Sequence, residues 1–261
     1  MIAPKKSLGQ NFLHEETSIL KIIDSLAISE SDTIVEIGPG RGALTKHLLK
    51  RNPKQVIAIE KDDRMVTFLT DGLGRCISSG KLQIEHADFL DWQAPQGEFK
   101  LVGNIPFYIT GKILRHVLDA PRHPSLMTLL MQKEVAERIV IADGKNSILG
   151  TAANVYCKPK IIGTVKPGAF FPSPKVMSAI VVCTEFHNPF ATTEERCGFF
   201  NFVHQIFSGK RKTLATNLKN IYERPPVIDA LKNHNQNVRA RAEDLTTETI
   251  LGLYRELNPQ S

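Results

Sequence analysis

The sequence predicts an α/β protein with a mostly parallel sheet and a small all-helical domain at its C-terminal end. Apolar segments typical of strands alternate with amphipathic segments typical of helices as far as about Glu185. A glycine-rich turn joins the first clear strand to the helix that follows it. Beyond Glu185 only helical spacing continues. We therefore expect one domain over residues 1–187 and a helical domain over residues 188–261.

The first part of the chain predicts a helix followed by strand–helix units. Residues 12–27 carry apolar side chains at helical spacing. The segment "TIVEIGPGRGALTKHLLK" then predicts a strand, a glycine turn and a helix, and "QVIAIEKDD" predicts a second strand that leads into another helix. The segment "LQIEHADFLDW" predicts a third strand that ends in acidic residues.

The rest of the first domain predicts further strands. The segment "FKLVGNIPF" predicts a fourth strand, and "SLMTLLMQKEVAERIV" predicts a strand that runs into a helix. The long segment "IIGTVKPGAFFPSPKVMSAIVVCTEF" predicts extended chain in which prolines mark the turns. Because strands that alternate with helices form parallel sheets covered on both faces, we expect such a sheet here.

The C-terminal segment predicts a helical domain with its own apolar core. Thr192 and Glu195 have the spacing of a capping box at the start of a helix. Ser208-Gly209 ends this helix, and two or three helical stretches follow. The apolar face of the first helix consists of Phe199, Phe202, Val203, Ile206 and Phe207.

The charge of the chain favours a polyanionic partner. The formal net charge is +6 and the pI is about 9.1. No acidic residue occurs between Asp143 and Glu185, a span that contains five lysines. A second basic cluster is Lys210-Arg211-Lys212. Two solvated surface faces are the alternative explanation of these clusters.

The composition argues against several classes of protein. No apolar run is long enough to cross a bilayer, and no apolar signal core follows the basic first residues. The four cysteines form no Cys-x-x-Cys pair and the histidines lack ligand spacing, which argues against a structural zinc site. We expect reduced thiols in the cytoplasm and no metal.

A glycine turn and two acids mark the carboxyl ends of adjacent predicted strands. Gly38, Gly40 and Gly42 allow the backbone to approach a ligand closely. Glu60 ends the next strand about twenty residues on, where a carboxylate can accept both ribose hydroxyls. Asp88 closes the third strand and could accept an adenine amino group, although helix caps also use such an acid. A dinucleotide site is the alternative, but its Gly-x-Gly-x-x-Gly spacing differs from the Gly-x-Gly-x-Gly found here.

Asn104 ends the fourth predicted strand at the same edge of the sheet. Its side-chain carbonyl is an acceptor, and the main-chain carbonyl of Ile105 is a second acceptor that Pro106 stiffens into place. Phe107 adds a flat apolar face. Two acceptors and a ring can hold a planar base by its exocyclic amine, whereas an ordinary Asn-x-Pro turn is the structural alternative.

Such an amine is a poor nucleophile because its lone pair is delocalised into the ring. Acceptors for both N–H groups favour a pyramidal, more electron-rich nitrogen, which could attack the methyl group of a sulfonium. The methyl group is already strongly electrophilic, so catalysis would be mainly positioning. The proton would leave after the methyl group has moved.

Seven motifs occur in order at matching spacing: "KKSLGQNFL", "EIGPGRGALT", "IEKD", "ADFL", "NIPFYIT", "FPSPKV" and "FSGKRKTL". They cover nearly the whole chain, which resembles the KsgA-type ribosomal RNA adenine dimethyltransferases and, less closely, the Erm resistance methyltransferases. The sequence departs from the family at Tyr108, where an amide is usual, and at Met177, where an aspartate is usual.

The resemblance implies a Rossmann-like methyltransferase fold that uses S-adenosylmethionine as methyl donor. It implies dimethylation at N6 of two adjacent adenosines near the 3′ end of 16S ribosomal RNA. The expected partners are this RNA and the small (30S) ribosomal subunit, with the chain acting as a monomer and no membrane involved.

The resemblance also implies a donor site. Gly38 would lie under the methionine part of the donor, Glu60 would hold the ribose, and Asp88 with Phe89 would recognise the adenine. The N-terminal segment would line the same site. The implied donor-site residues are Asn11, Leu13, Gly38, Glu60, Asp88, Phe89 and Asn104.

For the target base, the resemblance implies a second set of residues. Asn104 and Ile105 would grip the target amine. Phe107 would stack on the target base, and Phe170, from "AFFPSPKV", would cover its other face. The basic run "GKRKTL" would meet RNA phosphate.

Three other functions stay open at this point. An Erm-type enzyme acting on large-subunit (23S) ribosomal RNA would share the fold, and the long helical tail favours the small subunit only modestly. An RNA-binding assembly factor with a vestigial site is disfavoured because Gly38, Glu60, Asp88 and Asn104 are all present. A nicotinamide dehydrogenase is disfavoured by the glycine spacing and by the lack of an obvious hydride-handling His or Lys at the strand ends.

Overall fold

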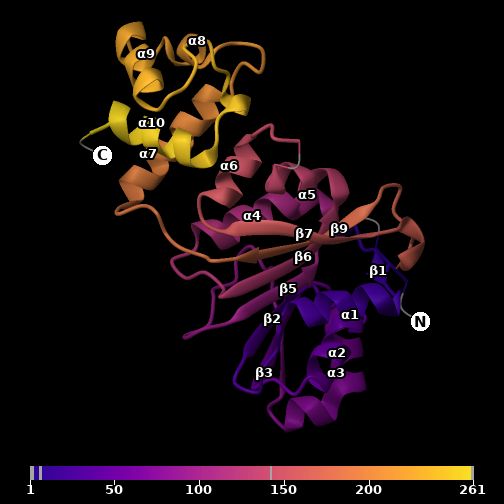
Figure 1. The fold of residues 1–261 in the computed structure, drawn as a ribbon. Coiled ribbons are helices and arrows are strands. Elements are labelled where there is room, and N and C mark those ends of the chain that lie inside the picture. Colours follow the sequence, from indigo (N-terminus) through magenta and orange to yellow (C-terminus); the bar gives the residue numbers. More distant parts are fainter. Residues whose placement is uncertain (1–2, 6–7, 142, 260–261) are drawn as a thin grey trace. The chain divides into compact units, whose positions relative to one another are not determined.

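The computed structural model describes residues 3–5, 8–141 and 143–259. The chain divides into two compact units, which are coloured along the sequence in Figure 1. Unit 1 holds the chain through Ala136 together with Pro159–Phe186. Unit 2 holds Glu137–Lys158 and the chain from His187 onward. The chain enters unit 2 for the second time at His187, and the boundary expected from the sequence lies after residue 187.

The segment Glu137–Lys158, which the sequence predicts as part of the first domain, packs instead with the helices of unit 2. The backbone N–H of Asn146 donates to the carbonyl of Glu243 over 2.8 Å, and its side-chain amide donates to the carbonyl of Leu245 over 3.1 Å. Lys145 also pairs with Asp244. These partners are distant in sequence, so the local pattern of residues could not indicate them.

Unit 1 is built on one sheet that contains seven strands in the described part of the chain. Five neighbouring strands pair in parallel, as predicted, and β9 pairs with β6 in the antiparallel direction. The order across the sheet is β4 (Leu82–His86), β3 (Gln55–Glu60), β2 (Thr33–Ile37), β5 (Lys100–Asn104), β6 (Leu126–Gln132), β9 (Ser178–Thr184) and β7 (Lys158–Val165).

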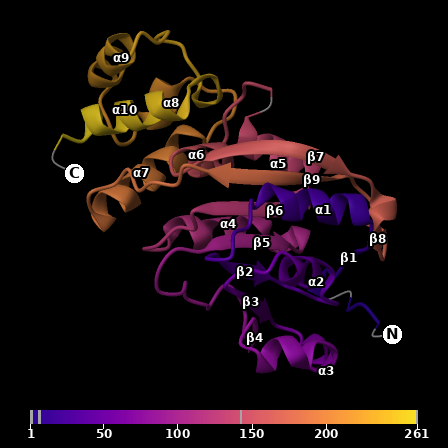
Figure 2. The same cartoon turned by 60° about the horizontal axis from the view of Figure 1, so that its bottom comes forward.

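Helices cover both faces of this sheet because the chain reverses its direction across it. The chain runs outward from β2 through β3 to β4 and then returns to β5 and β6 on the other side of β2. The crossovers that contain α2 and α3 therefore lie on one face and the one that contains α4 lies on the other, as Figures 1 and 2 show. Helix α1 precedes β2 and packs beside α2. The bounds are α1 (Glu16–Ser25), α2 (Ala43–Lys50), α3 (Asp63–Ser78), α4 (Thr110–Asp119) and α5 (Lys133–Val140).

A second, two-stranded sheet joins the N-terminal segment to the extended region before β9. Strand β1 (Phe12–Leu13) pairs antiparallel with β8 (Phe170–Phe171), and the two lie side by side in Figure 2. The helix predicted over residues 12–27 therefore begins later, at Glu16. Short 3₁₀ turns precede α4 and β8, at η2 (Phe107–Ile109) and η3 (Pro167–Ala169).

Unit 2 contains the helices that follow β9. Thr192 caps α7, because its hydroxyl oxygen accepts from the backbone N–H of Glu195 over 3.1 Å. Phe199, Phe202 and Ile206 are buried on the apolar face of that helix, as their spacing predicts. The bounds are α6 (Ile148–Asn154), α7 (Thr193–Ile206), α8 (Leu214–Leu218), α9 (Arg224–Asn233), η4 (Ala242–Asp244) and α10 (Thr247–Leu257).

Candidate active site

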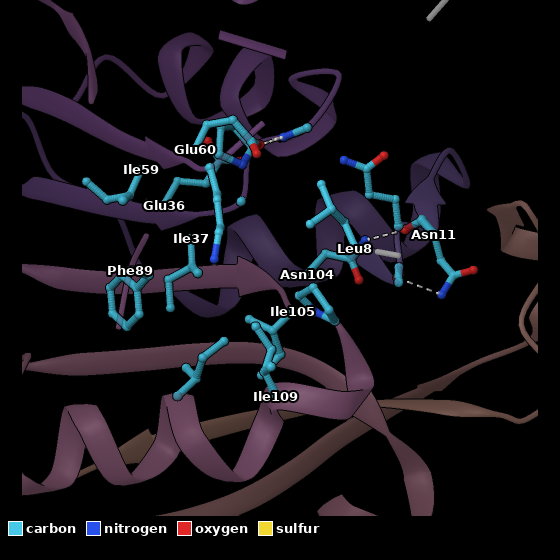
Figure 3. Close-up of a pocket in the computed structure, with 18 of the residues that line it drawn as sticks. Leu8, Asn11, Glu36, Ile37, Ile59, Glu60, Phe89, Asn104, Ile105 and Ile109 are labelled. Atoms are coloured by element: carbon cyan, nitrogen blue, oxygen red, sulfur yellow. Dashed lines mark hydrogen bonds between the residues drawn. The ribbon is translucent and has the colours of Figure 1, made fainter. Parts of the chain in front are cut away.

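One cavity lies at the carboxyl edge of the parallel strands in unit 1 (Figure 3). Gly38 follows β2, Glu60 ends β3, Asp88 lies two residues after β4, and Asn104 ends β5. All four line this cavity. The strand order reverses between β2 and β5, which is where open α/β sheets leave a crevice for a ligand. The row of strand-end residues predicted from the sequence is therefore assembled at one place.

The glycine turn after β2 leaves room for a ligand. Gly38 and Gly40 have φ angles of +62° and +55°, which favour glycine. A Cβ atom added at Gly38 would meet no atom within 4 Å, whereas one added at Gly40 would lie 2.9 Å from the ring of Phe12. Gly38 thus opens the wall of the cavity, and Gly40 lets the N-terminal segment pack closely against the turn.

Glu60 supports the same turn from β3. Its Oε2 accepts from the backbone N–H of Gly40 over 2.9 Å, and its Oε1 accepts from that of Asp62 over 2.8 Å. Burial raises the pKa of this carboxyl, and the backbone donors oppose that shift. Because a carboxylate oxygen can accept more than one hydrogen bond, Glu60 retains the capacity to bind ligand hydroxyls at the cavity wall.

Asp88 and Phe89 form the other end of the cavity. Asp88 pairs with Lys61 over 2.5 Å and accepts from the backbone N–H of Leu90 over 3.0 Å. The hydrogen bond from Lys61 lowers the pKa of Asp88. Phe89 is buried and its ring centre lies 5.7 Å from that of Trp92. This end of the cavity therefore combines an ionised acceptor with an apolar ring wall.

Asn104 is oriented by the N-terminal segment. Its Nδ2 donates to the main-chain carbonyl of Asn11 over 2.8 Å, drawn as a dashed line in Figure 3. Since this bond occupies the amino side of the amide, the oxygen of Asn104 is the acceptor that the side chain presents. The side chain of Asn11 itself bonds to the carbonyl of Gly9. Asn11 therefore contributes its main chain to this contact.

The turn after β5 forms another part of the cavity wall. Ile105 and Phe107 line the cavity next to Asn104, and the side chain of Ile105 is buried. Pro106 precedes the 3₁₀ turn that carries Phe107. Tyr108 also lines the cavity and is 63% exposed, so the ring that replaces an amide of the family pattern stands at the mouth of the cavity.

The N-terminal segment contributes more of the wall than the sequence indicates. Leu8, Gln10 and Phe12 line the cavity together with the predicted Asn11 and Leu13. The segment is held in place by contacts from the folded core. The side-chain amide of Gln10 donates to Asp62 over 3.0 Å, and Asp62 in turn pairs with Arg64 over 2.5 Å. Lys6 and Ser7 of the same motif lie outside the described residues. The residues that hold the N-terminal segment against the cavity are distant from it in sequence, so the local sequence gives no sign that Leu8, Gln10 and Phe12 line the wall.

Glu36 is a buried acid that sequence reasoning did not assign to the site. It lines the cavity near the end of β2, and its Oε2 accepts from the hydroxyl of Thr45 over 2.7 Å. Its residual exposure is 1%. Burial, with a smaller contribution from the charge of Glu60, raises the pKa of Glu36 to about 8. The side chain is therefore protonated in the ligand-free protein at neutral pH.

Phe170 is not where the sequence places it. The residue is 3% exposed and packs in the core with Leu13, so it does not line the cavity. The reason is strand alternation, because the ladder pairs Leu13 with Phe170 on the inner side and Phe12 with Phe171 on the outer side. Phe171 is the exposed ring of this pair.

No helix of the described residues is long and apolar enough to span a membrane. Within the same residues, no group of three or more His, Cys, Asp or Glu side chains could hold a metal ion.

Comparison with known proteins identifies the family of this chain. Residues 2–258 match the family model described as ribosomal RNA adenine dimethylase. The chain belongs to this family. A curated member, ribosomal RNA small subunit methyltransferase A of Chlorobium phaeobacteroides, is 37% identical over 262 residues, which cover 99% of this chain and 95% of the relative.

Two solved structures share the fold of this family member. A dimethyladenosine transferase from Plasmodium falciparum matches with a TM-score of 0.82 and 27% identity, covering 95% of this chain and 98% of that one. The 23S rRNA methyltransferase ErmE matches with a TM-score of 0.78 and 27% identity, covering 95% of this chain and 100% of that one. The Rossmann-like methyltransferase fold predicted from the sequence is thereby confirmed, and the chain is a methyltransferase.

Proposed function

We propose that this enzyme transfers methyl groups from S-adenosylmethionine to N6 of two adjacent adenosines in the 3′-terminal hairpin loop of 16S ribosomal RNA, within the 30S subunit in the cytoplasm. The observation that carries the proposal is the amide of Asn104, whose amino group is held by the Asn11 carbonyl beside the cavity. The name shared by the curated relatives supports the small subunit as substrate.

The residues at the strand ends fit the donor. Gly38 gives the methionine part room against the backbone, Glu60 accepts from the ribose hydroxyls, and Asp88 accepts from the adenine amino group against Phe89. When bound, the donor supplies a methyl group on a positively charged sulfur. The carboxylate of Glu60 at this wall favours a positively charged ligand, and the charge of such a ligand would in turn favour ionisation of the buried Glu36.

The turn after β5 fits the acceptor amine. The side-chain oxygen of Asn104 and the carbonyl of Ile105 accept from the two N–H groups of adenine N6, while Phe107 stacks on the base. These contacts hold the nitrogen lone pair toward the methyl group, and positioning of this kind lowers the barrier by several kcal/mol. As the N–C bond forms, the bond between the methyl carbon and the donor sulfur breaks and its electron pair stays on the sulfur as a neutral thioether. The nitrogen then loses its proton to water. A second cycle on the same nitrogen gives the dimethyl product.

A second candidate function is methylation of 23S ribosomal RNA, because the fold also matches ErmE closely. Purified small and large subunits that lack the modification, each incubated with the enzyme and labelled donor, separate the two functions. We expect label in the small subunit alone. Label in the large subunit alone would establish the second candidate instead.

Glu60→Ala should weaken donor binding by roughly 10- to 100-fold, because it removes a buried charged acceptor. Isothermal titration with S-adenosylmethionine gives the dissociation constant. Glu98→Ala, which removes an exposed carboxylate of the same unit, is the matched control and should bind like the wild type. An unchanged dissociation constant for Glu60→Ala would remove Glu60 from the donor site.

Replacing Lys210, Arg211 and Lys212 together with alanine should weaken RNA binding and flatten its salt dependence. All three side chains are exposed in the turn between α7 and α8. Loss of three phosphate contacts would reduce the slope of log K against log salt by about two. The matched control replaces Lys219, Arg224 and Lys232, which are exposed elsewhere in unit 2. Equal slopes for the two triple variants would place the Lys210 run away from RNA.

A further inference from the structure

The outer side of the β1–β8 ladder carries two aromatic rings and a guanidinium group. Strand alternation turns Leu13 and Phe170 into the core and leaves Phe12 and Phe171 on the opposite side. The Cζ atom of Arg41 lies 4.4 Å from the ring centre of Phe12 and 5.8 Å from that of Phe171. Both distances fall within the range of a cation–π contact. We call Phe12, Arg41 and Phe171 the outer aromatic layer.

The outer aromatic layer is open to solvent at Phe171 and continuous with the cavity at its other end. The side chain of Phe171 is 55% exposed. Phe12 and Arg41 both line the cavity, and the ring of Phe12 packs against the glycine turn at Gly40. About half of the surface of the Phe171 side chain stays in water, so this face is available for a ligand that approaches the cavity, and covering it would be favourable.

The surroundings of Phe171 favour a polyanion. Lys166 and Lys175 are exposed in the chain that flanks β8. Both lie in the span without acidic residues between Asp143 and Glu185. A flat ring stacked beside a guanidinium group, with further cations nearby, is the combination that binds unpaired nucleotides, because every base has a flat face. A protein partner could pair with these positive charges only if its own surface were strongly acidic.

We propose that the outer aromatic layer is a stacking site for an unpaired base of the RNA substrate, adjacent in the strand to the base that enters the cavity. This inference rests on the proposed function. A target base that leaves its stack deprives its neighbour of one stacking partner, and that loss is part of the energetic cost of flipping. The free face of Phe171 replaces the lost partner and so lowers this cost. The layer therefore holds the strand next to the target.

The test uses Phe171→Ala, Phe171→Leu and Phe171→Tyr in the full-length enzyme. The probe is a short oligoadenylate that carries 2-aminopurine, whose fluorescence falls when the base stacks on a ring. We expect Phe171→Ala and Phe171→Leu to bind the probe about tenfold more weakly, and Phe171→Tyr to bind like the wild type. Phe68→Ala removes another exposed phenylalanine of unit 1 and should leave binding unchanged. Thermal unfolding of each variant tests whether the fold is kept.

Methyl transfer to unmodified small subunits gives a second readout. Phe171→Ala should raise the KM for the subunit more than it lowers kcat, with the dissociation constant of the donor unchanged. Wild-type values of KM and of probe binding in Phe171→Ala would overturn the stacking site, while wild-type transfer would still support the proposed function. Absence of transfer by the wild-type enzyme would overturn the proposed function, and the oligoadenylate titration would then decide the stacking site by itself.

Discussion

Asn104→Ala should reduce kcat for methyl transfer by about 1,000-fold, because it removes an oriented acceptor from the reacting amine. The structure gives the reason for such a large effect. The amino group of this amide is held by the carbonyl of Asn11 over 2.8 Å, so its oxygen has one direction in which to accept. Alanine offers no acceptor, and water in its place would not be fixed. Binding of the donor should persist, since Gly38, Glu60 and Asp88 are unchanged.

Two further variants sharpen this prediction. Asn104→Asp keeps an oxygen acceptor but loses the amino group that bonds to Asn11, so the side chain is no longer oriented. We expect it to lose most of the activity as well. Gln83→Ala removes an exposed amide on β4 and should behave like the wild type. Steady-state transfer to unmodified small subunits gives kcat, and titration gives donor affinity. Normal turnover of Asn104→Ala would refute the role of this amide.

Glu36→Gln should stabilise the protein at alkaline pH by a few kcal/mol. The pKa of Glu36 is raised from 4.5 to about 8 in the folded protein, chiefly by burial. Between these two values the folded state keeps a proton that the unfolded state has lost. The free energy of unfolding therefore falls as the pH rises from about 4.5 to 8, and it stays at the lower level above that range. Glutamine stays neutral and can still accept from Thr45, so it removes this loss.

Urea unfolding of the wild type and of Glu36→Gln across this pH range measures the difference. The wild-type curve should fall with pH, and the Glu36→Gln curve should be flatter. A residual slope of the Glu36→Gln curve is expected because burial also raises the pKa of Glu60. The hydrogen bonds from Arg64 lower the pKa of Asp62, so Asp62 changes the free energy of unfolding only at acidic pH. Glu98→Gln, an exposed control, should keep the wild-type slope. Parallel curves for Glu36→Gln and the wild type would show that Glu36 is ionised in the folded protein.

The strand ends of the site could be predicted because their arrangement follows from local sequence. A strand pattern fixes where the strand stops, and the carboxyl ends of parallel strands share one edge of a sheet. Gly38, Glu60 and Asn104 are each the residue at or just after such an end. The parallel sheet and the first helix of the C-terminal domain followed from the same periodicities.

The N-terminal wall of the cavity could not be predicted in the same way. Strand β1 has two residues, too few to show an alternating pattern, and its partner β8 lies far along the chain. The register of that ladder decides that Phe170 is buried and Phe171 exposed, and a shift of one residue would exchange them. The placement of Glu137–Lys158 in unit 2 likewise depends on Asn146 bonding to residues near the C-terminal end.

Mapping of the modified nucleotides tests the central claim most directly. The enzyme is incubated with labelled S-adenosylmethionine and small subunits that lack the modification, and the RNA is then digested and analysed by mass. We predict N6,N6-dimethyladenosine at two adjacent positions of the 3′-terminal hairpin loop of 16S ribosomal RNA. Label at any other nucleotide, or no label in subunits that a known methyltransferase of this family still modifies, would contradict the account.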